Sequence, residues 1–461
     1  LVLVTASLAP ACNCSNDPRA GACEIDEDCL EMCEPGEIGQ CFEDTCRCLS
    51  DVPWGSIGQF SSMDIADDGM VWVAAYNSEH GDLVVASTRN MGRIPNESWQ
   101  FVDGVPEGPV VLPEFGVRGG IKAEGEDVGK YTDIVVSQTG TVMVSYFDSS
   151  SGSLKFAANY GDEWHVHIVD AGDLTADDIN TSKLAGQYSA ISLSASGVPS
   201  VAYFAHTGIN NLEPKTELRF AKANVAEPRS GGDWSIELID EAMVPPGDED
   251  AEADVLTIPY GTGLFVELTR DTADQPIVAY YDRINGDLKL ARYESGEFVL
   301  ETLDSEGDVG WYPSVVVDSD NVVHVSYVDA DNQDLLYIND LDMETELVDD
   351  GYRIVGTTED GLPLPEFHFV GDDSSIVLTP ESMYIVYQDA TTHELLAAYP
   401  NELGGWGRSG IAGNEIPFEG AYGFFANAKF DGNDVTMSSF VLDQRNDDSW
   451  VELFQRSVII E

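Results

Sequence analysis

The chain has 461 residues, 83 of them acidic and 22 basic, which gives a formal charge of −61. A charge of this size repels nucleic acid and anionic lipid head groups, so we expect neither as a partner. The 43% hydrophobic content, with 18 Tyr, 18 Phe and 8 Trp, is enough to build a packed core and argues against a largely disordered chain.

The first eleven residues read LVLVTASLAPA, an apolar run that ends in small residues just before Cys12. This pattern is typical of the end of an export signal, and Cys12 would then be the candidate lipid-carrying residue of a bacterial lipoprotein. Ala9, however, stands where such signals usually have Leu. Alternatively, residues 1–11 form an apolar arm that adds a strand to a neighbouring subunit. No later stretch has the roughly 18 apolar residues that a membrane-spanning helix needs.

All eight cysteines lie in residues 12–50, so we expect a small disulfide-rich module there, in an oxidising compartment. Cys29 and Cys33 are four residues apart, which places them on one face of a helix. Cys46 and Cys48 are two residues apart, which places them on one face of a strand. Two bridges would join that helix to that strand.

Six of these cysteines follow the spacing Cys23-x5-Cys29-x3-Cys33-x7-Cys41-x4-Cys46-x-Cys48. This pattern resembles the cysteine-stabilised αβ module of defensins. The resemblance implies the disulfide pairs Cys23–Cys41, Cys29–Cys46 and Cys33–Cys48. Because the segment is acidic, whereas defensin surfaces that attack membranes are usually basic, we interpret it as a structural cap or spacer.

From residue 53 onward one series of features recurs. A Gly-x-aromatic step leads into an alternating strand, a second strand ends in a small residue and an aromatic, and a third begins with an acidic residue and Leu. The second strand is the clearest marker, and its copies end at Tyr76, Tyr146, Tyr203, Tyr280, Tyr327, Tyr387 and Phe440. Seven markers in half-buried antiparallel strands predict an all-β fold, a β-propeller of about seven blades over residues 53–461. We expect the marker aromatics to pack between blades.

The Gly-x-aromatic motif at the start of the first strand is found in only some of the repeats. The motif reads Gly58-x-Phe60, Gly129-x-Tyr131, Gly186-x-Tyr188, Gly310-x-Tyr312 and Gly420-x-Tyr422, whereas the fourth and sixth units depart from it. The complete unit, clearest in residues 312–337, resembles propeller repeats of uncharacterised secreted proteins from myxobacteria and their relatives. That resemblance implies the fold and export, but no single activity.

Asp318 and Asp320, followed by Asp329, Asp331 and Asp334, form the most suggestive polar cluster. Alternate Asp side chains in tight turns can direct their oxygens toward a hard cation, so these five are candidate calcium ligands, and calcium is the one cofactor we expect. Asp is also a favoured turn residue for purely backbone reasons, so a structural role remains open.

No motif for a nucleophile with its base, or for a catalytic metal, is present, so we expect no enzyme. Our first hypothesis is a structural or adhesive protein, self-assembling, outside the cell or on its outer surface. Its partners would be copies of itself, another surface protein or a glycan. The alternative is a non-catalytic propeller that binds carbohydrate or protein through Trp311, Trp406 and Trp450. A third reading, a glycan hydrolase or lyase, would need two carboxylates facing each other across a cleft.

Overall fold

The structure, a computed structural model, describes residues 54–457 apart from 106–124, 162, 175–182, 209–213, 245–259, 359, 414–419, 444 and 447. It also describes the backbone of an N-terminal hairpin, β1 (Ile38–Phe42) and β2 (Thr45–Leu49). Cys12, the predicted helix around Cys29 and the side chains of the predicted disulfides lie outside the described part. Within it, no helix has the length and apolar character required to cross a bilayer.

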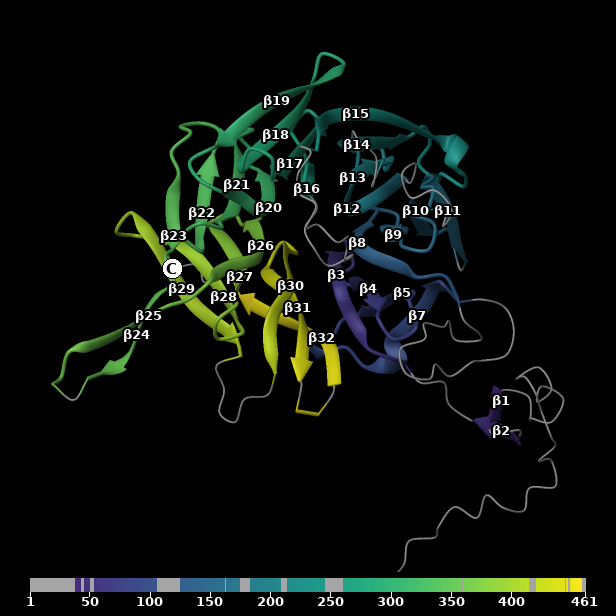
Figure 1. The fold of residues 1–461 in the computed structure, drawn as a ribbon, viewed down its shortest axis with the longest axis horizontal. Coiled ribbons are helices and arrows are strands. Elements are labelled where there is room, and N and C mark those ends of the chain that lie inside the picture. Colours follow the sequence, from purple (N-terminus) through teal and green to yellow (C-terminus); the bar gives the residue numbers. More distant parts are fainter. Residues whose placement is uncertain are drawn as a thin grey trace, which may run out of the picture.

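Seven four-stranded antiparallel sheets form the blades of a propeller (Figure 1). Blades 1 to 4 comprise β3 (Ile57–Ile65), β4 (Val71–Asn77), β5 (Asp82–Thr88) and β7 (Trp99–Asp103); β8 (Val128–Val136), β9 (Val142–Asp148), β10 (Ser153–Asn159) and β11 (Trp164–Asp170); β12 (Lys183–Leu193), β13 (Pro199–Thr207), β14 (Lys215–Ala223) and β15 (Trp234–Met243); and β16 (Thr262–Arg270), β17 (Pro276–Asp282), β18 (Asp287–Glu294) and β19 (Glu297–Asp304).

Blades 5 to 7 comprise β20 (Val309–Val317), β21 (Val323–Asp329), β22 (Asp334–Asn339) and β23 (Glu346–Asp349); β26 (Val370–Leu378), β27 (Met383–Asp389), β28 (Glu394–Asn401) and β29 (Gly405–Ala412); and β30 (Ala421–Phe430), β31 (Asp434–Asp443), β32 (Asp448–Ser457) and β6 (Gly92–Arg93). Two short 3-10 helices, η2 (Asn96–Ser98) and η4 (Gly231–Asp233), precede β7 and β15. The predicted seven-bladed propeller is confirmed.

The hydrophobic core lies between the blades. The second strand of each blade is buried because neighbouring blades cover both of its faces, and every residue of β9 and β17 is buried. The first strands contact one another in order, and β3 contacts β30, so the seven inner strands form a closed ring. The sequences of β9 and β17, VMVSYFD and PIVAYYD, consist mainly of β-branched, aromatic and other apolar residues, which fit a sheet that is covered on both faces.

The ring is closed by a strand from the other end of the chain. β6, which lies between β5 and β7 in sequence, leaves blade 1 and pairs with β32 as the outer strand of blade 7. Ile94 extends this contact, since its amide donates to the carbonyl of Val451 at 2.9 Å and its side chain is only 2% exposed. The last blade therefore depends on residues near the first.

The Gly-x-aromatic step has a specific backbone role in every blade. Each glycine and the residue two positions later have positive φ, so the inner strand contains a bulge at this point. The fourth and seventh units differ from the prediction, because Gly263-x-Phe265 and Gly423-x-Phe425 occupy these positions. In the sixth unit the glycine is Gly371, and Asp373 takes the place of the aromatic.

Hydrogen bonds from marker tyrosines join consecutive blades. Each hydroxyl donates to the aspartate at or near the end of the previous blade's outer strand, at 2.6–2.8 Å, in the pairs Tyr146–Asp103, Tyr203–Asp170, Tyr280–Asp240, Tyr327–Asp304 and Tyr387–Asp349. These five tyrosines are fully buried, as predicted for packing residues. Blades 1 and 7, which meet where the ring closes, have Ala75 and Ser439 at this position.

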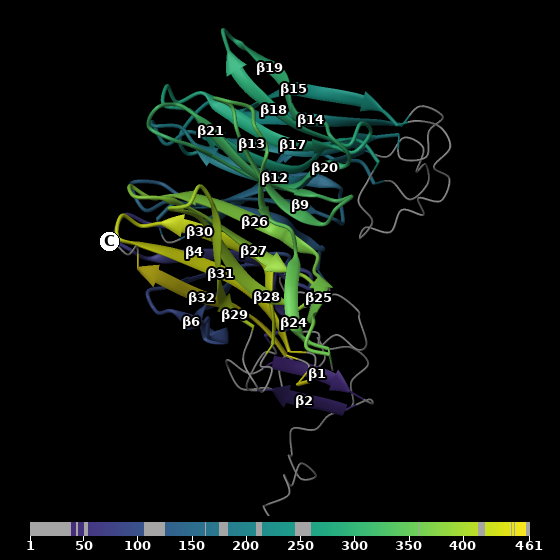
Figure 2. The ribbon, with the colours of Figure 1, turned by 90° about the vertical axis from the view of Figure 1, so that its left-hand side faces the viewer.

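One further hairpin lies outside the blades. β24 (Tyr352–Thr357) and β25 (Pro363–Phe367) form a two-stranded sheet between blades 5 and 6. In Figure 1 it projects from the rim at the lower left, and Figure 2 shows it from the side.

Candidate functional site

The seven positive-φ residues of the inner strands form a layer around the propeller axis, which we call the central aromatic layer. Its members are Phe60, Tyr131, Tyr188, Phe265, Tyr312, Asp373 and Phe425. Neighbouring rings are 4.5–5.2 Å apart between centroids, from Phe425 through Phe60 around to Tyr312. The layer is interrupted only in blade 6, where the Asp373 carboxylate accepts a hydrogen bond from the Phe425 amide at 2.7 Å.

The tyrosines and carboxyl groups of this layer have raised pKa values. Burial raises the pKa of Tyr131 to about 12, although a hydrogen bond with Tyr188 opposes the shift. Burial also raises the pKa of Asp373 to about 6 and that of Asp372 to about 7. The aromatic members of the layer are therefore uncharged at neutral pH, whereas Asp373 is mostly ionised there.

Two carboxylates lie one layer further along the inner strands. Asp133 in blade 2 and Glu267 in blade 4 follow the aromatic by two residues and hold equivalent registers, opposite Ser145 and Ala279. Lys429 of blade 7 lies two residues further still. Glu267 and Lys429 are exposed to solvent, so water reaches this part of the ring. We call Asp133, Glu267 and Lys429 the central cluster.

Asp133 is held rigidly by both neighbouring blades. Its Oδ1 accepts hydrogen bonds from the Ser62 hydroxyl of blade 1 at 2.6 Å and from the Ile134 amide at 2.9 Å. Its Oδ2 accepts one from the Ile191 amide of blade 3 at 2.7 Å. Burial raises the pKa of Asp133, but these hydrogen bonds and the charge of Lys429 favour the ionised form.

Glu267 has a different environment. Although its side chain is in contact with solvent, the surrounding blades partly desolvate it, and this desolvation, together with the charge of Asp133, raises its pKa to about 8, against the effect of Lys429. Burial opposes the charge of Lys429, yet the carboxylates of Asp64, Asp133 and Glu267 raise its pKa. At neutral pH we therefore assign a protonated Glu267 beside a charged Lys429 and a hydrogen-bonded Asp133. Carboxyl groups in such unequal states can divide acid and base roles between them.

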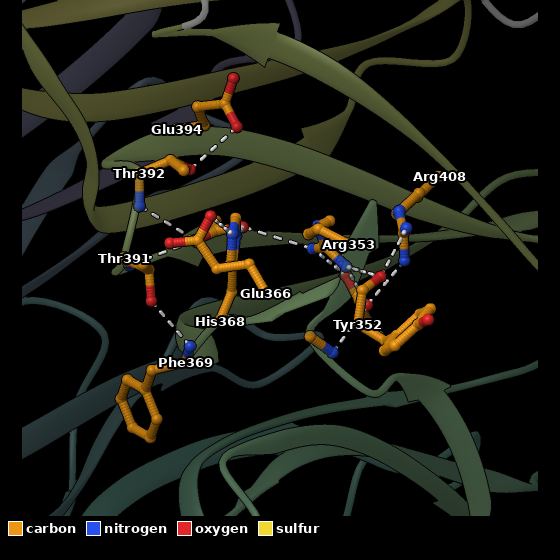
Figure 3. Close-up of polar contacts among 12 residues, drawn as sticks. Tyr352, Arg353, Glu366, His368, Phe369, Thr391, Thr392, Glu394 and Arg408 are labelled. Atoms are coloured by element: carbon orange, nitrogen blue, oxygen red, sulfur yellow. Dashed lines mark hydrogen bonds and ion pairs between the residues drawn. The ribbon is translucent and has the colours of Figure 1, made fainter. Parts of the chain in front are cut away.

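A second polar cluster lies at the root of the β24–β25 hairpin (Figure 3). His368 Nδ1 is 2.6 Å from Asp389 Oδ2, and Arg353 forms ion pairs with Asp349 at 2.8 Å and with Asp389 at 3.3 Å. Arg408 approaches Asp349 at 2.7 Å. His368 Nε2 is enclosed and has no hydrogen-bond partner among the described residues. This cluster fixes the hairpin, and a substrate has no access to the histidine.

The five predicted calcium ligands lie in two turns at opposite ends of β21. Asp318 Oδ1 accepts hydrogen bonds from the amides of Asp320 and Val322, and Asp329 Oδ1 accepts them from those of Asp331 and Asn332. A seven-residue strand separates the turns by about 20 Å, so the five cannot share one ion.

No group of three or more His, Cys, Asp or Glu side chains in the described ranges is arranged to hold a metal. Asp334 begins β22, and burial together with neighbouring carboxylates raises its pKa to about 6. Calcium binding at either turn remains a prediction.

The three predicted ligand-binding tryptophans are not brought together. Trp311 donates to Asp308 at 3.2 Å, beside the central aromatic layer. Trp406 donates to Glu346 at 2.9 Å and so links blade 6 to blade 5. Trp450 donates to Glu452 at 2.9 Å and packs under the guanidinium of Arg93.

The central cluster was missed because the sequence motif was aligned in only part of the repeats. With Gly263-x-Phe265 recognised as the fourth copy, the position four residues after the glycine reads Ser62, Asp133, Ala190, Glu267, Ser314, Ser375 and Asn427. Only two of these seven residues are acidic, and that contrast is the signal that identifies them. Nothing in the sequence pattern points to Lys429.

Comparisons with known proteins support the fold alone. No protein-family model and no curated protein matches the chain. Among solved structures, a protein of unknown function from Dyadobacter fermentans is similar with 11% identity and a TM-score of 0.42, covering 95% of this chain and 98% of its own. An ulvan lyase is similar with 10% identity and a TM-score of 0.46, and the match covers 88% of this chain and 96% of the lyase. An α-L-arabinanase from Penicillium chrysogenum is similar with 12% identity and a TM-score of 0.39, and the match covers 87% of this chain and 95% of the arabinanase.

The expectation that this chain is not an enzyme is corrected by these comparisons, since similar solved structures include a polysaccharide lyase and an arabinanase. At such identity they assign no activity to this chain. The absence of a linear catalytic motif does not exclude catalysis, because a propeller can bring groups together from different blades, where no local spacing reveals them.

Proposed function

We propose that the protein is an extracellular or surface-exposed glycan-cleaving enzyme, a hydrolase whose catalytic groups are the carboxyls of the central cluster. The observation that carries the proposal is the pairing of Asp133 and Glu267 from blades 2 and 4 in a water-accessible site, with unequal surroundings. Glycoside hydrolysis requires two such groups, one protonated and one ionised.

Glu267 is the general acid of this proposal. A carboxyl group with a pKa of about 8 is protonated at neutral pH and can donate its proton to the oxygen of the leaving sugar. Asp133 is the fixed carboxylate: its negative charge stabilises the positive charge that develops on the sugar ring, and it accepts a proton from the water that attacks the anomeric carbon as the glycosidic bond breaks. Lys429 favours the ionised state of Asp133, and the tyrosines of the central aromatic layer offer hydroxyl groups to a sugar.

A lyase is the second candidate, and Lys429 is the observation that favours it. Elimination from a uronic acid requires that the sugar carboxylate be neutralised and that a base remove the adjacent proton. Lys429 is the cation of the central cluster, and the hydroxyls of Tyr131 and Tyr188 lie in the adjoining layer. The two activities differ in product, because only elimination leaves an unsaturated sugar that absorbs ultraviolet light.

The experiment is a screen of neutral and uronic-acid-containing polysaccharides with the purified protein, with new reducing ends and ultraviolet absorbance both measured. We expect new reducing ends without absorbance, and loss of most activity in Glu267→Gln and Asp133→Asn, about a hundredfold or more. Glu297→Gln, exposed on the outer strand of the same blade as Glu267, is the control and should be unaffected. Activity that survives Glu267→Gln would reject this site.

A further inference from the structure

The one carboxylate of the central aromatic layer has no basic partner in the described part of the chain. Asp373 takes the place of the aromatic of blade 6, and its only hydrogen-bond donor among the described residues is the Phe425 amide, at 2.7 Å. Neither Asp373 nor the adjoining Asp372 forms an ion pair with a described Lys, Arg or His. Charges withdrawn from water are usually paired, so this position is suited to a cation supplied by a ligand.

Asp372 adds a second acceptor at the same place. Its Oδ1 is enclosed and has no hydrogen-bond partner among the described residues. Burial, together with the charges of Asp373 and Asp372, raises the pKa of Tyr312, so both carboxyl groups lie near that tyrosine. A protonated primary amine carries three N–H donors and accepts none, which matches two carboxyl groups beside a tyrosine hydroxyl.

The six rings of the central aromatic layer surround the same point. Their centroids are 4.5–5.2 Å apart from one ring to the next. Seven positions at that spacing in a closed ring lie about 5–6 Å from its centre, which is within the distance of a cation–π contact. All seven side chains are partly exposed, so a ligand can reach them. A cation at the axis would therefore be attracted by several rings as well as by Asp373.

The neighbouring central cluster favours a sugar as the carrier of this cation. Asp133 and Glu267 follow their aromatics by two residues, which places them about 7 Å further along the inner strands. Adjacent groups of one glycan can thus contact the layer and the cluster together. Lys429 lies two residues further still, and the charges of Asp64 and Asp133 act on it there. Its positive charge is therefore the most distant from the layer.

The charge of the whole chain favours the same class of ligand. A formal charge of −61 attracts polycations and repels polyanions. A polymer of amino sugars would be drawn toward the protein, whereas a polymer of uronic acids would be repelled.

We propose that the central aromatic layer binds the protonated amine of an amino sugar, and that the substrate is a glycan whose sugars carry free amino groups. The choice of a glycan rests on the proposed function. The amine donates hydrogen bonds to Asp373 and Asp372 and lies within reach of the aromatic rings. An N-acetylated sugar has neither this charge nor these donors, so we expect it to bind more weakly.

Calorimetric titration of the full chain carrying Glu267→Gln, which prevents cleavage, tests the proposal. The ligands are a glucosamine tetrasaccharide with protonated amines and its fully N-acetylated counterpart, in about 0.15 M salt to screen diffuse attraction to the acidic surface. We expect one site per chain, with at least about a tenfold preference for the free amine.

Three further substitutions in the same chain identify the site. Asp373→Asn should weaken binding of the free amine at least about tenfold and leave the N-acetylated sugar unaffected. Phe60→Leu should weaken it about threefold or more through loss of a cation–π contact. Glu297→Gln removes the same charge from an exposed position of β19 and is the matched control, with no expected change. Thermal unfolding checks the fold of each variant, and Phe60→Leu keeps the test valid where Asp373→Asn does not fold.

Equal affinity for the two sugars, or a preference that survives Asp373→Asn, would overturn the inference. Equal affinity for a tetralysine peptide would also overturn it, because charge alone would then be recognised. The hydrolase is tested separately, by reducing ends that the parent chain releases from a glucosamine polymer. Amine binding without cleavage would support the inference and count against the hydrolase alone. Cleavage of neutral glycans without a preference for the amine would reject the inference and keep the hydrolase.

Discussion

Asp82 is a fully buried carboxyl group at the start of β5, and neither of its oxygens has a hydrogen-bond partner among the described residues. Burial, with a contribution from the charge of Asp103, raises its pKa to about 8. The folded protein therefore binds a proton that the unfolded chain releases near pH 4. By linkage, this site's contribution to stability is complete below pH 4 and is lost as the pH rises toward 8.

Replacing Asp82 with Asn removes this ionisation and keeps the side-chain shape. We expect Asp82→Asn to raise the free energy of unfolding at pH 8 by about 5 kcal/mol and to change it little at pH 4. Denaturant unfolding of both proteins at the two pH values measures the effect. An equal change at both would show that Asp82 does not titrate between them.

At the scale of the strand, the glycine of each inner-strand bulge is required for two reasons. Gly129 has a φ of +102°, and a Cβ atom there would lie 2.8 Å from the Cα of Leu83 in blade 1. Gly140, in the β8–β9 turn, has a φ of +82° but has nothing within 4 Å of such an atom. Substitutions at these two glycines therefore distinguish the cost of backbone strain alone from the added cost of a steric contact.

We expect Gly140→Ala to cost about 1 kcal/mol of stability, the price of its φ alone. Gly129→Ala should cost at least about 2 kcal/mol more, because blades 1 and 2 must also move apart. Thermal unfolding of the two variants gives the comparison. Equal losses would mean that the blades separate easily at this point.

The tyrosine–aspartate bonds between blades make a second prediction at this scale. Tyr203 donates to Asp170 at 2.8 Å, and that carboxylate is also paired with Lys183 and Arg219. Tyr203→Phe keeps the ring and removes one bond to a charged acceptor, so we expect a loss of about 1.5–3 kcal/mol in denaturant unfolding. Tyr293→Phe, a half-buried tyrosine on β18, should change stability by less than about 0.5 kcal/mol. A similar loss of stability in both variants would show that the Tyr203–Asp170 hydrogen bond has no special role.

For the whole molecule, closure of the ring depends on β6. Ile94 packs with Val451 and Leu453 of blade 7 although it follows β5 of blade 1. Ile94→Ala should cost about 2–5 kcal/mol, since it opens a cavity and weakens closure. Met91→Ala, at a position 37% exposed beside the same strand, should cost far less. Denaturant unfolding of the two variants measures these losses of stability. A small loss in Ile94→Ala would mean that the other interfaces between blades are sufficient to keep the ring closed.

The sequence predicts the fold of this protein well but does not predict its candidate site. Period-two alternation and the recurrent small-aromatic ending are local signals, and they were sufficient for seven blades because each blade repeats them. Closure by β6 was not predictable, since Gly92 and Arg93 carry no strand pattern. Asp133, Glu267 and Lys429 lie more than a hundred residues apart, and only the ring brings them together. The turn aspartates were more conspicuous in sequence, but their oxygens accept backbone hydrogen bonds.

The most direct test of the proposed hydrolase is the pH dependence of kcat/KM on a polysaccharide that the parent chain cleaves, compared with Glu267→Gln. With Glu267 as the general acid, kcat/KM falls as the pH rises through about 8, and Glu267→Gln loses most activity and that limb together. A variant that keeps the alkaline limb, or keeps the activity, would contradict catalysis by the central cluster.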